Sequence, residues 1–481
     1  MDTPSTQNAQ SAPSEDRIPA KVICAFISAG LLSFSGVIVE TAMNITFPTL
    51  MHEFGVSTDQ VQWMTTAYLL VVSIMVPLSA SFKARFRSKS LFIAANLLFI
   101  AGLCLDLAAQ NFPMLIGGRV VQGLGTGIAL PLMFNIILEQ VPARKIGTMM
   151  GMGTLITAIA PAIGPTFGGI VVTRMGWRYI FVFILPILAI SLLMGILSIE
   201  QKSELRKVHF DLLSLVLIAL TFCGLIYGFS SMTTRSFLSL NVAGAMLVGI
   251  VACVCFVLRQ LKSSNPILDL HALSNLNFAG YILTFFLFQI ASLGLAFLLP
   301  NYMQLVNGSS ALVSGLTVLP GAVLGAVFAP LGGRILDTLG AKPPLLTGPG
   351  LAIVSVILFF IFGKHLSNAG ICGIYLLYMA GMGMSSGNIM TTGLSQLNRQ
   401  MQSHGNALFN TVQQFAGAVG TSVCAALVAA GQAGASSQAI GTANGSTLAF
   451  GVLVVVLAVQ YLTILKVLLK PFSAPKQALE A

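Results

Sequence analysis

Long apolar runs, most of them about 20 residues or more, recur along the whole chain. An α-helix rises ~1.5 Å per residue, so a run of ~20 apolar residues crosses the ~30 Å hydrocarbon core of a bilayer. Charged residues make up only 8% of the sequence and hydrophobic residues 56%, whereas soluble domains are usually about a quarter charged. The runs are also too long for the ~10-residue alternating strands of a membrane β-barrel. The sequence therefore predicts an all-α polytopic membrane protein.

The apolar runs predict fourteen membrane spans. Their approximate limits are 21–48, 59–80, 89–109, 112–138, 147–172, 178–198, 211–230, 240–258, 277–300, 310–331, 344–363, 368–393, 405–430 and 447–469. When sides alternate from the N-terminus, nineteen of the 24 Lys and Arg residues share the side of the chain ends. Positive residues concentrate in cytoplasmic segments, so both ends are expected in the cytoplasm. Twelve spans remain an alternative if 211–230 and 240–258 do not cross.

Two hydrophilic joints, 199–210 and 259–277, divide the spans as six, two and six. We expect the following units: a disordered cytoplasmic tail at 1–18, a six-helix bundle at 19–198, joints with two inserted helices at 199–276, a second six-helix bundle at 277–470 and a tail at 471–481. The loops 80–89 and 333–342 occupy matching places in the two bundles and form a weak repeat. Internal repeats are typical of secondary transporters, whose site forms near the bilayer midplane between the halves.

Several other classes of protein are excluded by residue patterns. The net charge of +10 does not indicate nucleic-acid binding, because the positive residues lie in short segments between apolar runs. The seven cysteines lack metal-ligand spacing and are expected to be small core residues, so no metal site is predicted. The five histidines lie in loops or at span ends, which disfavours a histidine proton relay. No P-loop and no nucleophile–base arrangement appears, so neither an enzyme nor a bound cofactor is expected.

Arg119 is a permanent charge eight positions into the apolar run 111–138. A guanidinium that faces lipid costs several kcal/mol or more, so it is expected to have a carboxylate partner or a water-filled cavity. Glu40 is the candidate partner: at 1.5 Å per residue, Glu40 and Arg119 lie at similar depths, roughly 15 and 12 Å from the outer face. A carboxylate that moves between a cation and an apolar site gains and loses proton affinity, which predicts proton coupling by this pair. A static structural ion pair is the alternative. Asp106 is a possible secondary acid, although its place near the outer interface favours a solvated helix end.

Uncharged polar groups and glycines within the spans are further candidates. Gly164-Pro165 predicts a helix kink and the glycines around it allow close helix contact, as a hinge or as ordinary tight packing. Polar side chains that either bind substrate or join helices are Asn44, Gln122, Asn135, Gln289, Gln413 and Gln414. Some of the 31 Phe and 20 Met residues are expected to line a cavity for varied lipophilic ligands.

Four motifs together resemble the major facilitator superfamily, specifically its fourteen-span drug:proton antiporter branch. Arg119, Gln122, Gly123 and Gly125 match its fourth-helix pattern R-x-x-Q-G-x-G. The fifth-helix antiporter pattern is matched by Gly153, Gly164, Pro165, Gly168 and Gly169, with Ala160 where a glycine is usual. Glu40-Thr-Ala-Met-Asn44 and Pro48 are similar to its first-helix pattern. The cytoplasmic gating loops keep Gly333, Asp337, Gly340 and Lys342 in the second half, but in the first half Arg85 and Lys89 remain while Ala84 replaces the aspartate.

The resemblance implies the major-facilitator-type fold, with two bundles and alternating access. It further implies proton-driven efflux of lipophilic drugs, lincomycin among them, across the plasma membrane of a bacterium, with the proton gradient in place of a cofactor. The expected partners are lipophilic substrates, protons and the bilayer, and the chain is expected to be a monomer. Export of an endogenous metabolite, peptide or lipid is an alternative. A non-transporting sensor or assembly factor is a second alternative, which the retention of Glu40 beside a buried cation disfavours.

Overall fold

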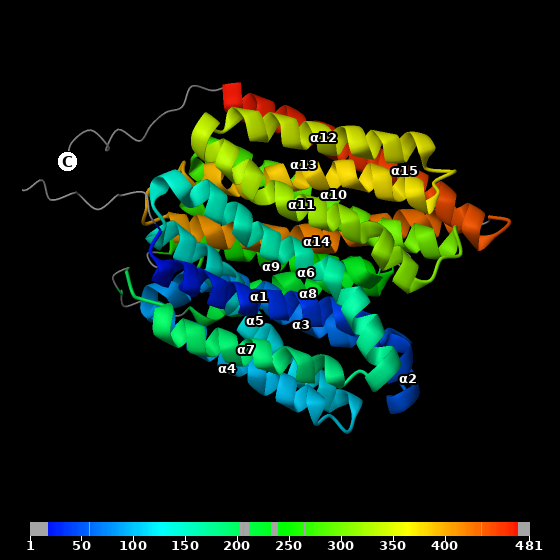
Figure 1. The fold of residues 1–481 in the computed structure, drawn as a ribbon, viewed down its shortest axis with the longest axis horizontal. Helices are drawn as coiled ribbons and strands as arrows, with labels where there is room; N and C mark the ends of the chain where they lie inside the picture. The colour runs from blue at the N-terminus through cyan, green and yellow to red at the C-terminus, as the bar shows by residue number, and fades with distance from the viewer. Residues whose placement is uncertain are drawn as a thin grey trace, which may run out of the picture.

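The computed structural model describes residues 18–56, 58–202, 205, 211–231, 239–263, 266–433 and 435–469. These residues form long helices that run roughly side by side (Figure 1). The tails expected at 1–18 and 471–481 lie outside the described residues, apart from Ile18.

The described residues contain fourteen helices of 20 residues or more. They are α1 (Ala20–Asn44), α3 (Thr58–Arg85), α4 (Ser88–Leu107), α5 (Phe112–Gln140), α6 (Ile146–Met175), α7 (Tyr179–Ser198), α8 (Leu212–Ser231), α9 (Leu240–Lys262), α10 (Leu276–Leu305), α11 (Ala311–Leu339), α12 (Lys342–Phe362), α13 (Asn368–Leu394), α14 (Gln402–Gln432) and α15 (Gln438–Leu469). Shorter elements are α2 (Phe47–Phe54), η1 (Ala143–Lys145) and η2 (Leu270–Ser274). Several long helices begin at a capping side chain, because the oxygens of Asn111, Ser310 and Ser367 accept a backbone N–H three residues on.

Twelve of these helices are long and apolar enough to cross a bilayer. α6 becomes a thirteenth candidate span if its two parts, which are bent by 41° between Pro161 and Thr166, count as one. In α8 only the stretch Leu212–Gly228 qualifies, as a shorter apolar helix. The polytopic all-α prediction is thus confirmed, and the count of fourteen spans stays a prediction.

Following the units expected from the sequence, we describe the long helices as one group of six before α8 and α9 and one group of six after them. In the first group α1 packs on α5, α6 and α7, while α4 packs on α5 and α7, and α3 on α5. In the second group α10 packs on α13, α14 and α15, while α13 also packs on α11 and α12. We call these groups the N-bundle and the C-bundle. They meet along α6 with α11 and α13, and along α14 with α3 and α5.

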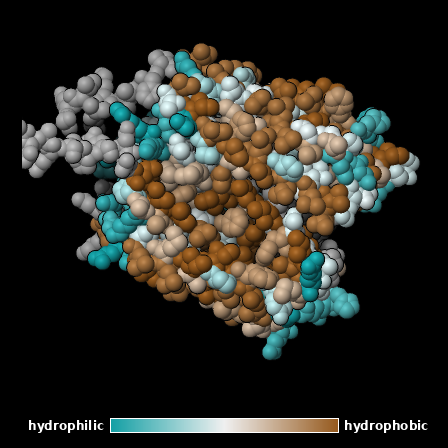
Figure 2. Space-filling model, viewed as in Figure 1, coloured by the Kyte–Doolittle hydropathy of each residue, from teal (hydrophilic) through white to brown (hydrophobic). Residues whose placement is uncertain are grey.

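The two ends of the molecule differ from its middle. Hydrophobic residues cover the middle of the face in Figure 2, and hydrophilic residues gather at both ends. Large apolar side chains on the helices are exposed, such as Leu193 at 64% and Ile361 at 63%, which fits a lipid-facing surface. We call the end where α1 begins the terminal end and the opposite end, beside the short helix α2, the α2 end (Figure 1).

At the α2 end, α2 is tied to the start of α7. Trp177 Nε1 donates to one carboxylate oxygen of Glu53 at 2.7 Å, and Arg178 pairs with the other at 2.7 Å. Arg178 also donates to the carbonyl of Ala109 at 2.7 Å. Burial raises the pKa of Glu53, but the bonds from Trp177 and Arg178 outweigh it and hold the pKa below the ordinary 4.5.

Glu53→Gln is expected to destabilise the protein at pH 7 by about 1 kcal/mol or less, since the pair is partly exposed and screened by solvent. Because the folded pKa is depressed, the wild-type advantage exists at neutral pH and disappears as the pH falls through that pKa. Melting temperatures of the purified protein at pH 7 and below pH 4 measure this. Glu200→Gln is the control, because Glu200 pairs with Lys21 on the exposed surface. An equal decrease in melting temperature in both variants would contradict a stabilising role for the contacts of Glu53 with Trp177 and Arg178.

Candidate functional site

Arg119 lies inside the N-bundle, where its side chain is fully buried. It projects from the first third of α5, which packs closely on both α3 and α4. Its Nε donates to the carbonyl of Met64 on α3 at 3.4 Å. Its guanidinium also lies over the ring of Tyr68 on α3, 4.4 Å from the centroid, a cation–π contact. Arg119 therefore faces protein and not lipid.

A hydrogen-bonded chain connects Arg119 to Asp106. Arg119 Nη1 donates to Gln122 Oε1 at 2.6 Å, and Gln122 Nε2 donates to Asp106 Oδ2 at 2.6 Å. Asp106 and Gln122 are both fully buried. The expectation of a solvated helix end for Asp106 is therefore wrong. Gln122, expected to face substrate or to join helices, joins α5 to α4.

Glu40 lies near this chain but outside it. Its side chain is half-buried, in contrast to the fully buried Arg119 and Asp106. Arg119 interacts electrostatically with both Glu40 and Asp106. Within the described part of the chain, however, no ion pair shorter than 4.0 Å joins Glu40 to Arg119, so the expected direct pair is not formed.

Tyr68 connects the charged cluster to α1. Its hydroxyl lies 3.0 Å from the Gly36 carbonyl, one turn before Glu40, and 3.0 Å from Thr126 Oγ1 on α5. A Cβ at Gly36 would overlap the Thr126 hydroxyl and stand tightly against that of Tyr68. Because the same ring supports the guanidinium of Arg119, Tyr68 fixes α1, α3 and α5 around the site. No charge or motif in the sequence marked this tyrosine as a site residue.

Two glycines allow α4 and α5 to approach closely at the site. A Cβ at Gly118 would overlap the carboxylate of Asp106, and one at Gly102 would overlap the side chain of Gln122. The hydrogen bond between Asp106 and Gln122 therefore depends on glycine at both positions. Gly118 stands directly before Arg119 in the sequence, which was the available signal.

The glycines of α6 pack directly beside Glu40. A Cβ at Gly164 would overlap Thr41 Oγ1, and one at Gly168 would press on the backbone of Ala42. Both contacts join α6 to the residues that follow Glu40 on α1.

The other residues of the antiporter motif lie in different environments. Gly153 packs on the ring of Phe134, while Gly169 has open space where a Cβ would stand. The side chain of Pro165 lies outside the described part of the structure. The bend of α6 spans Pro165, in agreement with the predicted kink.

The remaining polar candidates lie in different places. Asn44 is exposed at the end of α1 and accepts from Thr65 at 2.6 Å. Gln289 is 2% exposed, and its Oε1 has no hydrogen-bond partner among the described residues. Gln413 and Gln414 are half-buried on α14. Half-burial is compatible with a cavity lining for these two, whereas Gln289 is enclosed.

Asn135, also expected to face a cavity or join helices, joins the two bundles. It is 2% exposed, and its Oδ1 accepts from Asn406 on α14 at 2.9 Å. Asn406 also donates to the Pro131 carbonyl at 3.0 Å, and Asn410 donates to Asn406 Oδ1 at 2.8 Å. These three asparagines form a buried ladder between α5 and α14.

Asp337 makes a second inter-bundle contact at the terminal end. Its carboxylate accepts the backbone N–H groups of Gly147 and Thr148, both at 2.9 Å, and the Thr148 hydroxyl at 2.7 Å. The C-bundle thus caps the N-terminus of α6, where a negative charge is favoured. Gly333 allows this approach, since its Cβ would overlap the carbonyl of Gly147.

The other predicted gating residues do not take part in this contact. Gly340 ends α11 at φ 84°, which favours glycine. Arg85, Lys89 and Lys342 are exposed at the terminal end.

Comparison with known proteins agrees with this architecture. The family model of the Major Facilitator Superfamily matches residues 26–421. The lincomycin resistance protein LmrB of Bacillus subtilis (strain 168) is 38% identical over 416 residues, which cover 86% of each chain. The multidrug resistance protein B homolog of Mycobacterium tuberculosis (strain ATCC 25618 / H37Rv) is 27% identical over 417 residues, or 84% of this chain and 77% of that one.

Solved structures show the same fold. The proton:xylose symporter XylE matches with a TM-score of 0.64 and 14% identity, over 94% of this chain and 96% of its own. The human organic anion transporter MFSD10 matches with a TM-score of 0.62 and 14% identity, over 94% of this chain and 100% of its own. At such low identity the likeness concerns the fold alone.

Gly118→Ala is expected to destabilise the protein by about 1–3 kcal/mol, because the added methyl forces α4 and α5 apart at Asp106. The measurement is thermal unfolding in detergent. Its control is the neighbouring Gly117→Ala, where the structure has open space, so that only the helix-propensity gain remains. Equal melting temperatures for the two variants would contradict the close contact.

Proposed function

The chain belongs to the major facilitator superfamily, and we propose that it exports lipophilic drugs by proton antiport across the plasma membrane of a bacterium. Its relatives are named for resistance to lincomycin and to multiple drugs, which supports export over uptake. The observation that carries the proton coupling is the cluster of one buried cation with two carboxyl groups. Export of an endogenous compound remains the alternative substrate class.

Charge balance explains why this cluster suits proton coupling. One guanidinium offsets one carboxylate, so Arg119, Asp106 and Glu40 are together neutral when one carboxyl group holds a proton. Without that proton the cluster carries one negative charge, which is costly within a bilayer unless water or a substrate reaches it. Glu40 is the half-buried member and is therefore the proposed point of proton exchange. Asp106, held by Gln122, balances Arg119 throughout the cycle.

Alternating access is proposed to occur by rocking of the N-bundle against the C-bundle. In the proposed topology all fourteen long helices cross the membrane and the terminal end faces the cytoplasm, as the positive residues predict. Five hydrogen bonds join the bundles at that end, through Asp337 and Asn406. The structure then represents a state that is closed toward the cytoplasm at these contacts. Release of both contacts would open the cytoplasmic side.

Glu40→Gln is expected to reduce proton-dependent export on the order of tenfold or more, because the amide cannot exchange a proton. Accumulation of lincomycin and of ethidium in an efflux-deficient bacterium, with and without a protonophore, measures this. Asp106→Asn is expected to impair export as well, by leaving Arg119 without its buried counter-charge. The matched control is Glu139→Gln at the end of α5, since Glu139 pairs with Lys83 away from the cluster.

Three outcomes of that experiment are decisive. Wild-type export that ignores the protonophore contradicts proton coupling. Full activity of Glu40→Gln removes Glu40 from the mechanism. Absence of export for all drugs tested, in a correctly inserted protein, favours an endogenous substrate or a non-transporting role.

Asp337→Asn is expected to loosen the terminal end, since about 2 kcal/mol of charge-assisted hydrogen bonding to α6 is lost. Spin labels at Lys145 and Thr338 should then report longer distances between α6 and α11. The control is Asp211→Asn, because Asp211 lies outside this contact and pairs with Arg259. An unchanged distance distribution in Asp337→Asn would contradict the proposal that Asp337 holds the two bundles together at the terminal end.

A further inference from the structure

The inserted helices α8 and α9 form a hairpin with its own close packing. A Cβ at Gly224 would overlap the backbone of Ala245 and Gly249, and one at Gly228 would overlap Met246. Glycines four residues apart let two membrane helices approach closely. α9 packs mainly on α8, whereas α8 also contacts α3 of the N-bundle and α14 of the C-bundle. The hairpin therefore lies against the seam between the bundles through α8.

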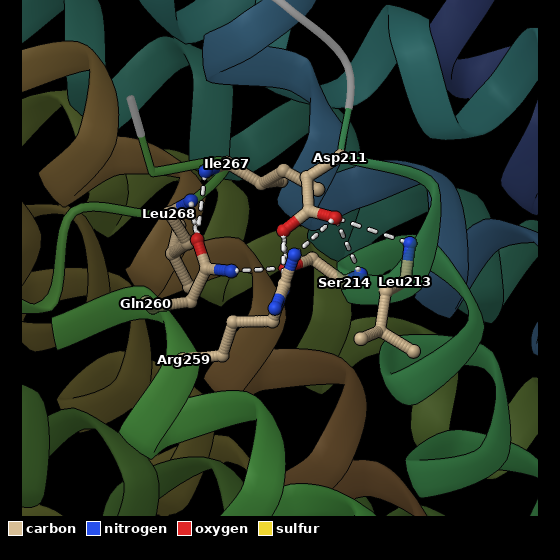
Figure 3. A network of polar contacts seen from close by, with 7 residues as sticks. All are labelled: Asp211, Leu213, Ser214, Arg259, Gln260, Ile267 and Leu268. Carbon is tan, nitrogen blue, oxygen red and sulfur yellow. Dashed lines mark hydrogen bonds and ion pairs between the residues drawn. The ribbon is translucent and has the colours of Figure 1, made fainter. Parts of the chain in front are cut away.

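A polar network holds the hairpin at the terminal end (Figure 3). Arg259 donates from Nε and Nη2 to the carboxylate of Asp211 at 2.5 and 3.0 Å, which holds the pKa of Asp211 well below its usual range. Gln260 is 1% exposed, donates to Ser214 at 2.7 Å and accepts from Ile267 N at 2.7 Å. This end of the hairpin is fixed by polar bonds.

The other half of the hairpin borders an apolar groove. A hollow of about 390 Å³ is lined by α3, α8 and α9, and we call it the lateral groove. Trp63 and Tyr227 stack at its α2 end, with centroids 6.4 Å apart. Among the described residues of its lining, only Thr66 and Tyr227 carry hydroxyl groups, and none is charged. Sites for drug-sized ligands normally add several placed polar groups that orient the ligand, so this lining fits hydrocarbon better.

The lateral groove is continuous with the lipid-facing surface. Among its lining residues Leu220 is 42% and Val248 is 52% exposed, and on α9 this surface continues through Leu247 and Val251, which are also more than half exposed. When an apolar hollow is empty, the side chains that line it lose dispersion contacts. In a bilayer the neighbouring molecules that can supply those contacts are lipid chains.

The lateral groove spans roughly two-thirds of one leaflet. From Trp63 to Leu70 on α3 is seven residues, or roughly 10 Å along the axis. Half of the hydrocarbon core is roughly 15 Å thick. The aromatic pair lies at the α2 end of the groove, where Trp and Tyr rings prefer the membrane interface. A chain that enters beside these rings reaches most of the way to the bilayer centre.

We propose that the lateral groove binds one acyl chain of a phospholipid from the leaflet at the α2 end. The chain fills the space between α9 and α3, and so completes the packing of the inserted hairpin on the N-bundle. The hairpin is thereby a lipid-binding element placed at the seam along which the bundles meet.

Quenching of Trp63 by brominated lipid tests this proposal. The sequence has two tryptophans, so Trp177→Phe leaves Trp63 as the single fluorophore. The full-length protein is reconstituted in phosphatidylcholine vesicles with dibrominated acyl chains. Gly244→Leu fills the groove, because a Cβ there meets open space. The matched control is Gly373→Leu on α13, an exposed glycine with open space in the other bundle.

Gly244→Leu is expected to lower the quenching of Trp63 at least about twofold, since contact is lost when the groove is filled, while Gly373→Leu leaves it unchanged. Native mass spectrometry of the same proteins should show one retained phospholipid that only Gly244→Leu loses. Val248→Phe fills the groove from its exposed side and repeats the test if Gly244→Leu fails to fold.

Two outcomes overturn the proposal. Equal quenching and equal lipid retention in all variants would show that the chain near Trp63 is ordinary bulk lipid. A dimer of the wild type that Gly244→Leu converts to a monomer would show that a second copy of the chain covers the groove.

Discussion

A guanidinium buried inside a membrane bundle needs groups that offset its charge and accept its five N–H donors. Around Arg119 such groups come from three helices: a carbonyl and an aromatic ring on α3, an amide on α5 itself, and through that amide a carboxylate on α4. Its Nη2 has no hydrogen-bond partner among the described residues. Each contact requires its helix to stand at one distance and one rotation. The close approach at Gly118 and the bridging hydroxyl of Tyr68 follow from that requirement. The interior of the N-bundle is thus organised around a single charge.

The fold could be predicted from the sequence to the extent that it depends on hydrophobicity. Apolar runs locate the long helices because the bilayer imposes one length and one composition on each of them. The same pattern does not predict the short helix α2, because α2 is held by contacts with Trp177 and Arg178, which lie more than a hundred residues later in the sequence.

The site was predicted less completely. The sequence gives the depth of a residue along its helix, but it does not give the rotation of the helix about its axis, which decides which side chains face each other. Equal depth suggested that Glu40 pairs with Arg119, but the facing carboxylate belongs to Asp106, with Gln122 between them. Position near a span end suggested that Asp106 is solvated, yet the residue is fully buried. For Asn135 the sequence left a cavity group and a helix contact both open, because an amide carries no sign of its partner, and its partner Asn406 lies 271 residues away. A charged residue within an apolar run indicates where a site lies. Which residue it pairs with depends on packing between helices that are far apart in the sequence.

The geometry also links the proposed proton step to the proposed rocking of the bundles. Glu40 is followed directly by Thr41 and Ala42, and these are the residues that Gly164 and Gly168 of α6 contact. α6 is bent beside this contact, and its other end is capped by Asp337 of the C-bundle. A change of charge at Glu40 that shifts α1 therefore acts on the helix that carries the main inter-bundle contact. Because glycine contacts leave no slack, a small displacement of α1 cannot be absorbed at Gly164 and must move α6. In the proposed cycle, protonation of Glu40 is therefore connected to the inter-bundle contact of Asp337 through backbone packing, without a charged residue between them.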